Sequence, residues 1–294
     1  MERGNLDRWS IRFMSIIAFL TSLIAIIIAI VLMWKSFPLL QISTIQEIVL
    51  GSIWQPLAGG FGFFPFIMGT IWVTLLAMGI AIPLGLFSAI FLAEYSPSYI
   101  RESIKPLIDL LAGIPSVLFG LWGILVIVPW VRDTIAPMWG VSTTGYCVLT
   151  GGIVLSIMVL PLIISLSDEL FRTVPLDIRK ASLALGATKW QTVKYVLFRK
   201  TYPGLLAAII LGFSRAFGET MAVLMVVGNV AKVPTSVFDP AYPLTALIAN
   251  NYGEMLSIPL FDSAIMMAAL ILFIIVVIFN ILSKMLLIRI RKAV

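Results

Sequence analysis

Residues 180–203 read KASLALGATKWQTVKYVLFRKTYP, a stretch that predicts two short helices around a glycine. Pro175, just upstream, suits the first turn of a helix, and Gly186 suits the position just past its end. Thr188 and Gln191 then have the spacing of a capping box, which opens a second helix. The local pattern is therefore a helix–glycine–helix unit.

The second of these helices is amphipathic. Apolar side chains recur at three- and four-residue intervals and are separated by lysines: Trp190, Val193 and Leu197 against Lys189, Lys194 and Lys200. The unit is too short and too charged to cross a bilayer. Its apolar side must pack on the membrane surface, on the rest of the chain, or on a soluble partner.

The sequence around this unit is that of an integral membrane protein. Hydrophobic residues make up 61% of the chain and charged residues 12%, whereas about a quarter of a soluble protein is charged. The mean hydropathy is +1.09. Six apolar runs match the roughly 20 residues that a spanning helix needs: Phe13–Trp34, Phe66–Ala93, Leu107–Val131, Cys147–Leu166, Leu205–Asn229 and Phe261–Leu287. We therefore expect an all-α membrane protein with six transmembrane helices.

The distribution of cations predicts the orientation. With the N-terminus inside, only Lys35, Arg132 and Lys232 lie on the outer side, Arg215 lies within a span, and every other Lys and Arg lies inside. This bias follows the positive-inside rule and places both termini in the cytoplasm, in a multi-pass protein of the cell membrane. The first apolar run is longer than that of a signal peptide and no small-residue cleavage site follows it, so we expect a retained anchor.

Several kinds of chemistry are excluded by residue usage. The chain has no histidine and one cysteine, Cys147, so His-ligated metal sites, intrachain disulfides and CxxC sites are impossible. The P-loop pattern GxxxxGK followed by Ser or Thr does not occur, so ATP is not bound by that device. We expect no enzymatic activity and no cofactor in this chain. The positive net charge reflects orientation and not a nucleic-acid partner.

Two charges of opposite sign, Arg215 and Glu219, lie within the fifth predicted span. Residues four apart in a helix lie about 40° apart around its axis, so a continuous helix over Leu205–Asn229 would place both charges on one face near the midplane. Asn229 falls on the same stripe, whereas Thr220 points about 140° away from Arg215.

Placing these two charges within the membrane costs free energy, which some interaction must offset. An uncompensated charge at the bilayer centre costs roughly 2.5–3.5 kcal/mol on the insertion scale, while an i,i+4 pair returns about 0.2–0.5 kcal/mol in water. One reading is a salt bridge that fixes this helix against a neighbour or a second subunit. The other is an anion pathway, because the guanidinium fork matches an oxyanion.

At this point the loop resembles a known signature, the coupling loop of ABC-importer permeases, in which Glu-Ala-Ala precedes a glycine. Gly186 matches the family glycine, followed by Ala187, and the three Glu-Ala-Ala positions are Lys180, Ala181 and Ser182. The chain departs from the pattern at Lys180, where the motif has Glu, and at Arg199, where many relatives have Pro. The resemblance implies that this loop sits in a cleft of an ATPase subunit.

Three further stretches, GTIWVTLLAMGIAIPLGLFSAIFLAEYSP, LLAGIPSVLFGLWGILVIVPW and RAFGETMAVLMVVGN, resemble the phosphate-specific importer permeases from about residue 60 onward. This resemblance implies a type I, MetI-like permease that forms half of a pore for inorganic phosphate. It also implies a sister permease, two copies of an ATPase subunit that bind ATP and magnesium, and an external phosphate-binding protein.

We accordingly expect an N-terminal anchor and external loop over 1–65, a permease domain over 66–288, and a cytoplasmic coupling loop over 167–204 within it. Arg215, Glu219, Asn229 and Thr220 are the candidate pathway residues, with Arg215 attracting the anion and Glu219 keeping its binding weak. Glu219 can also accept a hydrogen bond from protonated phosphate, which sulfate cannot donate. The alternatives are the sister phosphate permease, a permease for sulfate or molybdate, a secondary transporter, and a membrane scaffold.

Overall fold

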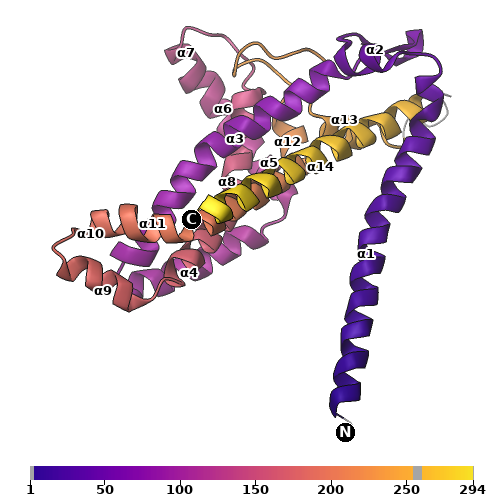
Figure 1. The fold of residues 1–294 in the computed structure, drawn as a ribbon. Coiled ribbons are helices and arrows are strands. Elements are labelled where there is room, and N and C mark those ends of the chain that lie inside the picture. The colour runs from indigo at the N-terminus through magenta and orange to yellow at the C-terminus, as the bar shows by residue number, and fades with distance from the viewer. Residues whose placement is uncertain (1–2, 254–259, 294) are drawn as a thin grey trace.

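The computed structural model describes the backbone of residues 3–253 and 260–293, and the side chains of 11–56, 58–253 and 260–288. Within these residues six helices are long and apolar enough to cross a membrane, as expected: Ile11–Leu40, Phe64–Tyr95, Ser116–Met138, Val148–Arg172, Lys189–Phe217 and Phe261–Ile288. Figure 1 shows them as a tilted bundle from which the first helix diverges.

Several of these spans are built from more than one helical segment. The first, fourth and sixth spans are each a single helix: α1 (Arg3–Leu40), α8 (Val148–Arg172) and α14 (Phe261–Ala293). The other three consist of several segments. The second joins α3 (Phe64–Ile90) to the π-helical η2 (Phe91–Tyr95). The third runs through α5 (Ser116–Trp122), η3 (Gly123–Ile127), α6 (Val128–Trp130), η4 (Val131–Ile135) and α7 (Ala136–Met138). The fifth joins α10 (Lys189–Gln191), η5 (Thr192–Leu197) and α11 (Phe198–Phe217).

Shorter elements connect the spans. They are α2 (Ile45–Leu50), β1 (Trp54–Gln55), η1 (Pro56–Ala58), β2 (Gly60–Phe61), α4 (Ser98–Gly113), α9 (Leu176–Ala184), α12 (Met221–Val226) and α13 (Leu244–Asn251). The two strands form an antiparallel hairpin in which Trp54 pairs with Phe61.

The helix α3 packs along α8 at the centre of the bundle. Glycines allow the close approach: a side chain at Gly85 would meet Ile163, and one at Gly152 would meet Leu76. Small residues at helix contacts are typical of membrane proteins, where packing replaces the hydrophobic effect. In contrast, the most apolar stretch of α1 buries none of its residues, as expected of an anchor that lies in lipid.

At the end of the bundle that carries α2 in Figure 1, the loop between α1 and α3 packs around Trp54. The Trp54 ring contacts the rings of Phe63 at 5.3 Å and Phe66 at 5.0 Å between centroids, both edge-on. Edge-to-face aromatic pairs add about 0.5–1.5 kcal/mol each beyond their buried area. This aromatic cluster fastens the hairpin to the start of α3.

The third predicted span, Leu107–Val131, was misplaced. Its first residues belong to α4, which ends at Gly113, and the membrane helix begins only at Ser116. The reason is Pro115, which cannot donate a backbone hydrogen bond and holds the preceding Ile114 in an extended conformation, with a ψ of 130°. The helix α4 is instead an amphipathic connection that packs on α8.

The fifth predicted span, Leu205–Asn229, was wrong at both ends. The membrane helix begins at Lys189 and ends at Phe217, after which Gly218, Glu219 and Thr220 are not helical. The second half of the predicted cytoplasmic loop 167–204 is therefore the start of this long helix. Between the helices α8 and α10 only residues 173–188 remain as the loop itself.

The helix–glycine–helix prediction within this loop is confirmed. The helix α9 covers Leu176–Ala184, and Gly186 follows it with a φ of +84°, which glycine adopts at little cost. Both halves of the capping box form: the Thr188 N–H donates to Gln191 Oε1 at 2.8 Å, and the Gln191 N–H donates to Thr188 Oγ1 at 3.2 Å.

Candidate functional site

The two intramembrane charges lie on either side of the break between α11 and α12. Arg215 is in the last turn of α11, and Glu219 lies two residues before α12 begins. The prediction that both share one face of a continuous helix is therefore wrong. Counted from Thr201, the residue after the cations Arg199 and Lys200, Arg215 lies about 21 Å along the helix at 1.5 Å per residue. This is less than the core thickness of about 30 Å, so a span that starts after these cations places the break within the membrane.

Each charge suits the helix end beside it. The Glu219 carboxylate accepts a hydrogen bond of 3.2 Å at Oε1 from the Ala222 N–H, in the first turn of α12, where unpaired donors favour an anion. Arg215 lies where the carbonyls at the end of α11 favour a cation. Among the described residues no ion pair joins the two side chains. The break thus supplies a local electrostatic reason for both charges.

The Arg215 side chain is exposed, as are those of Leu211, one turn before it, and Met221, the first residue of α12. No hydrogen bond or ion pair to its guanidinium is formed within the described part of the protein. A guanidinium has five donors and cannot lose its charge. It is therefore available to an anion or to a group on another subunit.

The Glu219 side chain is half-buried beside a very small cavity of ≈ 10 Å³ that Thr70, Thr74 and Thr245 also line. The Thr245 hydroxyl donates to the Glu219 carbonyl oxygen at 2.9 Å. The Thr70 hydroxyl accepts from the Leu244 N–H at 2.9 Å, so α13 is fixed against α3 at the same level. Apolar side chains, among them Val73, Phe217 and Val223, complete the lining of this cavity, so Glu219 lies in a mixed environment between α3, α13 and the break.

The other two pathway candidates have local structural roles. Thr220 donates to the Gly218 carbonyl oxygen at 3.3 Å, within the break. Asn229 is not on a helical stripe with Arg215, because α12 ends at Val226. It has a φ of 52° and donates from Nδ2 to the Leu224 carbonyl oxygen at 2.8 Å, so it closes the end of α12. Asparagine is among the few residues that adopt this conformation readily.

The coupling loop presents both polar and apolar side chains outward. Lys180, Ala181 and Gly186 are exposed, while Ser182 and Ala187 are half-buried. The Ser182 and Thr192 hydroxyls share a hydrogen bond of 2.9 Å, which joins α9 to η5. Leu185 is 89% exposed, the largest exposure among the large hydrophobic side chains of the described part. Of the apolar side expected for the second helix, Val193 and Leu197 are buried in the bundle and Trp190 is half-exposed.

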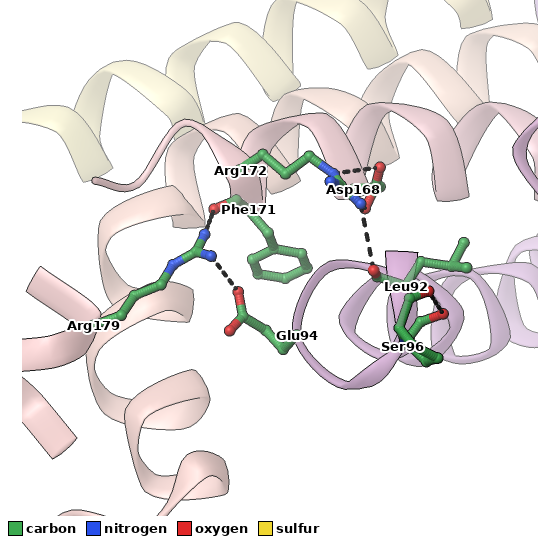
Figure 2. Close-up of polar contacts among 8 residues, drawn as sticks. Leu92, Glu94, Ser96, Asp168, Phe171, Arg172 and Arg179 are labelled. Atoms are coloured by element: carbon green, nitrogen blue, oxygen red, sulfur yellow. Dashed lines mark hydrogen bonds and ion pairs between the residues drawn. The ribbon is translucent and has the colours of Figure 1, made fainter. Parts of the chain in front are cut away.

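One ion pair holds the loop to the bundle, and a second lies within α8 beside it, as Figure 2 shows. Arg179 of α9 lies 3.1 Å from Glu94 of η2, and both side chains are mostly but not fully buried, with exposures of 15% and 10%. Arg172 at the end of α8 donates to Asp168 at 2.8 Å and to the Leu92 carbonyl oxygen at 3.3 Å. Removing one partner of a buried pair typically costs about 3–5 kcal/mol. Sequence reasoning missed Glu94, although it is an acidic residue at the end of an apolar run.

A carboxylate also organises the loop between α12 and α13. Asp239 Oδ2 accepts hydrogen bonds from the Thr235 N–H at 2.9 Å, the Thr235 hydroxyl at 2.8 Å and the Ser236 N–H at 2.9 Å. These bonds, that from the Thr235 backbone foremost, hold the pKa of Asp239 below its usual value. The Asp239 carbonyl oxygen in turn accepts from the Val148 N–H at 3.0 Å, so the loop caps the first turn of α8.

Among the described residues no group of three or more Cys, Asp or Glu side chains could hold a metal ion. The arrangement offers two sites of recognition: an exposed guanidinium for an anion at the break, and an exposed, partly apolar loop for a protein surface.

Comparison with known proteins gives a consistent picture. A family model described as "Binding-protein-dependent transport system inner membrane component" matches residues 81–292. The phosphate transport system permease protein PstC of Xylella fastidiosa (strain Temecula1) is 34% identical over 278 residues, which cover 90% of this chain and 85% of that one. The PstC of Pasteurella multocida is 33% identical over 98% of this chain and 92% of its own.

A probable ABC transporter permease protein of Bacillus subtilis, YqgH, is 44% identical over 194 residues, and this chain spans only 61% of that relative. Among solved structures, an inward-facing MetNI methionine ABC transporter matches with a TM-score of 0.59 at 16% identity, over 81% of this chain and 99% of that one. An ABC transporter for the import of alginate matches with a TM-score of 0.56 at 12% identity, over 96% and 98%. The expected MetI-like architecture is confirmed.

Proposed function

Since the chain belongs to the family of binding-protein-dependent transport system inner membrane components, we propose that it is the permease subunit of an ATP-driven importer of inorganic phosphate. Membership implies an ATPase partner and a substrate-binding protein. The choice of phosphate rests on relatives named as phosphate transport permeases that align over most of both chains.

The observation that carries the pathway is the exposed Arg215 guanidinium at a helix break inside the membrane. Broken helices are tolerated in a bilayer only where the freed backbone is buried in protein or lines a water-filled cavity. Such breaks bind ions in other transporters. An anion arriving at the break would meet the guanidinium first, with the carbonyls and hydroxyls of Gly218–Thr220 beside it.

Glu219 provides the opposing charge. Its carboxylate limits how strongly an anion is held, and conduction requires binding that is weak enough for release. A carboxylate can also accept a hydrogen bond from a protonated phosphate, which fully ionised sulfate cannot donate. We therefore assign Arg215 to attraction and Glu219 to release and to discrimination against sulfate.

Because Arg215 is exposed on the outside of the bundle, one chain alone does not enclose a pore around it. A second permease chain would complete the pore. In this arrangement two copies of an ATPase subunit, which bind ATP and magnesium, contact the loop at Lys180–Ala187. Both termini lie on the same, cytoplasmic side as that loop. A phosphate-binding protein delivers its ligand at the opposite end, where the external loops lie.

Reconstitution tests the function directly. The chain would be assembled with its sister permease, ATPase and binding protein in lipid vesicles, and ATP hydrolysis measured with phosphate, sulfate or molybdate loaded on the binding protein. Stimulation by phosphate alone is expected. Stimulation by sulfate or molybdate alone would replace the substrate, and uptake driven by an ion gradient without ATP would indicate a secondary transporter.

A further inference from the structure

One turn of helix at the inner end of α3 contacts each of the elements that surround the coupling loop. The Leu92 carbonyl oxygen accepts a hydrogen bond from Arg172 at the end of α8. Glu94 pairs with Arg179 of α9. The Tyr95 ring lies 5.2 Å from the ammonium of Lys189, the first residue of α10. Figure 2 shows the first two contacts side by side.

This turn, η2, is π-helical, and the Ser96 N–H closes it by donating to the Phe91 carbonyl oxygen at 2.8 Å. π-Helical turns occur mostly as single turns inside α-helices, often at functional sites. The chain leaves it through Pro97 into α4. A displacement of η2 would therefore reach α3 on one side and α4 on the other.

The helix α9 is held to the bundle by few contacts. None of its residues is fully buried, and its apolar contact with the core is made by the partly buried Ile178. Its inward polar contacts are the ion pair from Arg179 to Glu94, the hydrogen bond of 2.6 Å from Arg179 to the Phe171 carbonyl oxygen, and the hydroxyl contact of Ser182. The next residue after Arg179 is the exposed Lys180, so the outward face of α9 is free for another protein.

We propose that Glu94 and Arg179 are positioning residues that transmit movement of the coupling loop to α3 and α4. This inference rests on the proposed function, because it needs an ATPase that moves α9. The pair suits this task because it is largely shielded from water, so salt screens its attraction little. In addition, the guanidinium contacts both the Glu94 carboxylate and the Phe171 carbonyl oxygen. Movement of α9 then displaces both together.

The test uses the assembled transporter in vesicles and the ratio of phosphate taken up to ATP hydrolysed. Glu94→Gln removes the charge and keeps the shape, and we expect this ratio to fall about 2- to 30-fold, the range typical of residues along a coupling route. Hydrogen exchange of the backbone amides of Leu176–Ala184 is expected to quicken in the same variant. The double exchange Glu94→Arg with Arg179→Glu is expected to recover part of the ratio.

Asp133→Asn is the matched control, since it removes one partner of an exposed pair with Arg132 at the opposite end of the bundle. It should leave the ratio unchanged. The proposal is overturned if Glu94→Gln keeps the wild-type ratio of uptake to hydrolysis. It is also overturned if uptake and hydrolysis fall by the same factor and this factor equals the loss of assembled complex. If the wild-type complex does not respond to phosphate, the proposed substrate fails, while the exchange of the α9 amides still tests the pair.

Discussion

The Thr245 hydroxyl donates a hydrogen bond of 2.9 Å to the Glu219 carbonyl oxygen and thereby ties the start of α13 to the break after α11. This single bond fixes the backbone from which the Glu219 carboxylate projects. Thr245 is buried, so its hydroxyl cannot be replaced by bulk water.

Thr245→Val should therefore weaken the break. Losing the donor leaves a carbonyl without its partner, which costs about 1–3 kcal/mol. The expected result is a lower melting temperature of the purified complex together with slower uptake. Thr245→Ser, which keeps the hydroxyl, should restore both, and equal melting temperatures for the Val variant and wild type would contradict the assignment.

Arg215→Ala should abolish most transport without unfolding the chain, because the side chain is exposed. A hydrogen bond to a charged group contributes about 1.5–3 kcal/mol, or roughly 10- to 150-fold in rate if it acts at the barrier. Radiolabelled phosphate uptake measures the loss. Arg215→Lys keeps the positive charge but not the planar guanidinium with its paired donors, so we expect a rate of uptake between those of wild type and the Ala variant. Full uptake by the Ala variant would exclude a pathway role.

Glu219→Gln should alter selectivity more than stability. The amide oxygen can still accept the hydrogen bond from Ala222, so α12 keeps its cap. The lost charge removes the repulsion of a doubly charged anion. We expect sulfate in excess to inhibit phosphate uptake in this variant and not in wild type. Unchanged uptake with unchanged rejection of sulfate would remove Glu219 from the mechanism.

Gly186→Ala should impair the coupling loop through its backbone alone. There is open space around this glycine, so a methyl group meets no atom, but the φ of +84° costs a non-glycine residue roughly 1–2 kcal/mol. Stimulated ATP hydrolysis should fall severalfold. Asparagine tolerates this conformation better, so Gly186→Asn should retain more activity than the alanine variant. The reverse order would point to contacts of the side chain instead.

The external loop should lose its order in acid. The folded pKa of Asp239 lies below its ordinary value, so the carboxylate stabilises the loop above about pH 4, near the unfolded value, and loses this effect as the pH falls through the folded pKa. Asp239→Asn should reduce the exchange protection of the Val148 and Leu149 amides at neutral pH. The difference from wild type should vanish in acid, and a difference that persists there would have another cause.

Much of the fold could be predicted because hydropathy and helical period act locally. The capping box at Thr188 and the left-handed conformation of Gly186 follow from a few neighbouring residues, and both are present. The break at Gly218–Thr220 could not be seen this way, since apolar residues continue on both sides of Arg215 and Glu219 and keep the run long enough for one helix. It depends on contacts between residues far apart in the sequence, such as the hydrogen bond from Thr245 to the Glu219 carbonyl oxygen. The periodicity of apolar residues along the chain does not reveal such contacts.

The candidate site was predicted in part for the same reason. Arg215 and Glu219 were found because a charge within an apolar run is conspicuous. Glu94 was missed because it stands at the border of a span, where a charge is common. Only the folded chain brings it to Arg179, 85 positions later.

The helix from Lys189 to Phe217 has no interruption between the coupling loop and the break. Its η5 part is π-helical and turns by less per residue than the α-helix on either side, where each residue turns by about 100°. The angular phase between Trp190 and Arg215 is therefore set both by the number of residues between them and by the length of the π-helical part. An inserted residue would leave the hydropathy unchanged and yet rotate the guanidinium unless that part absorbed it.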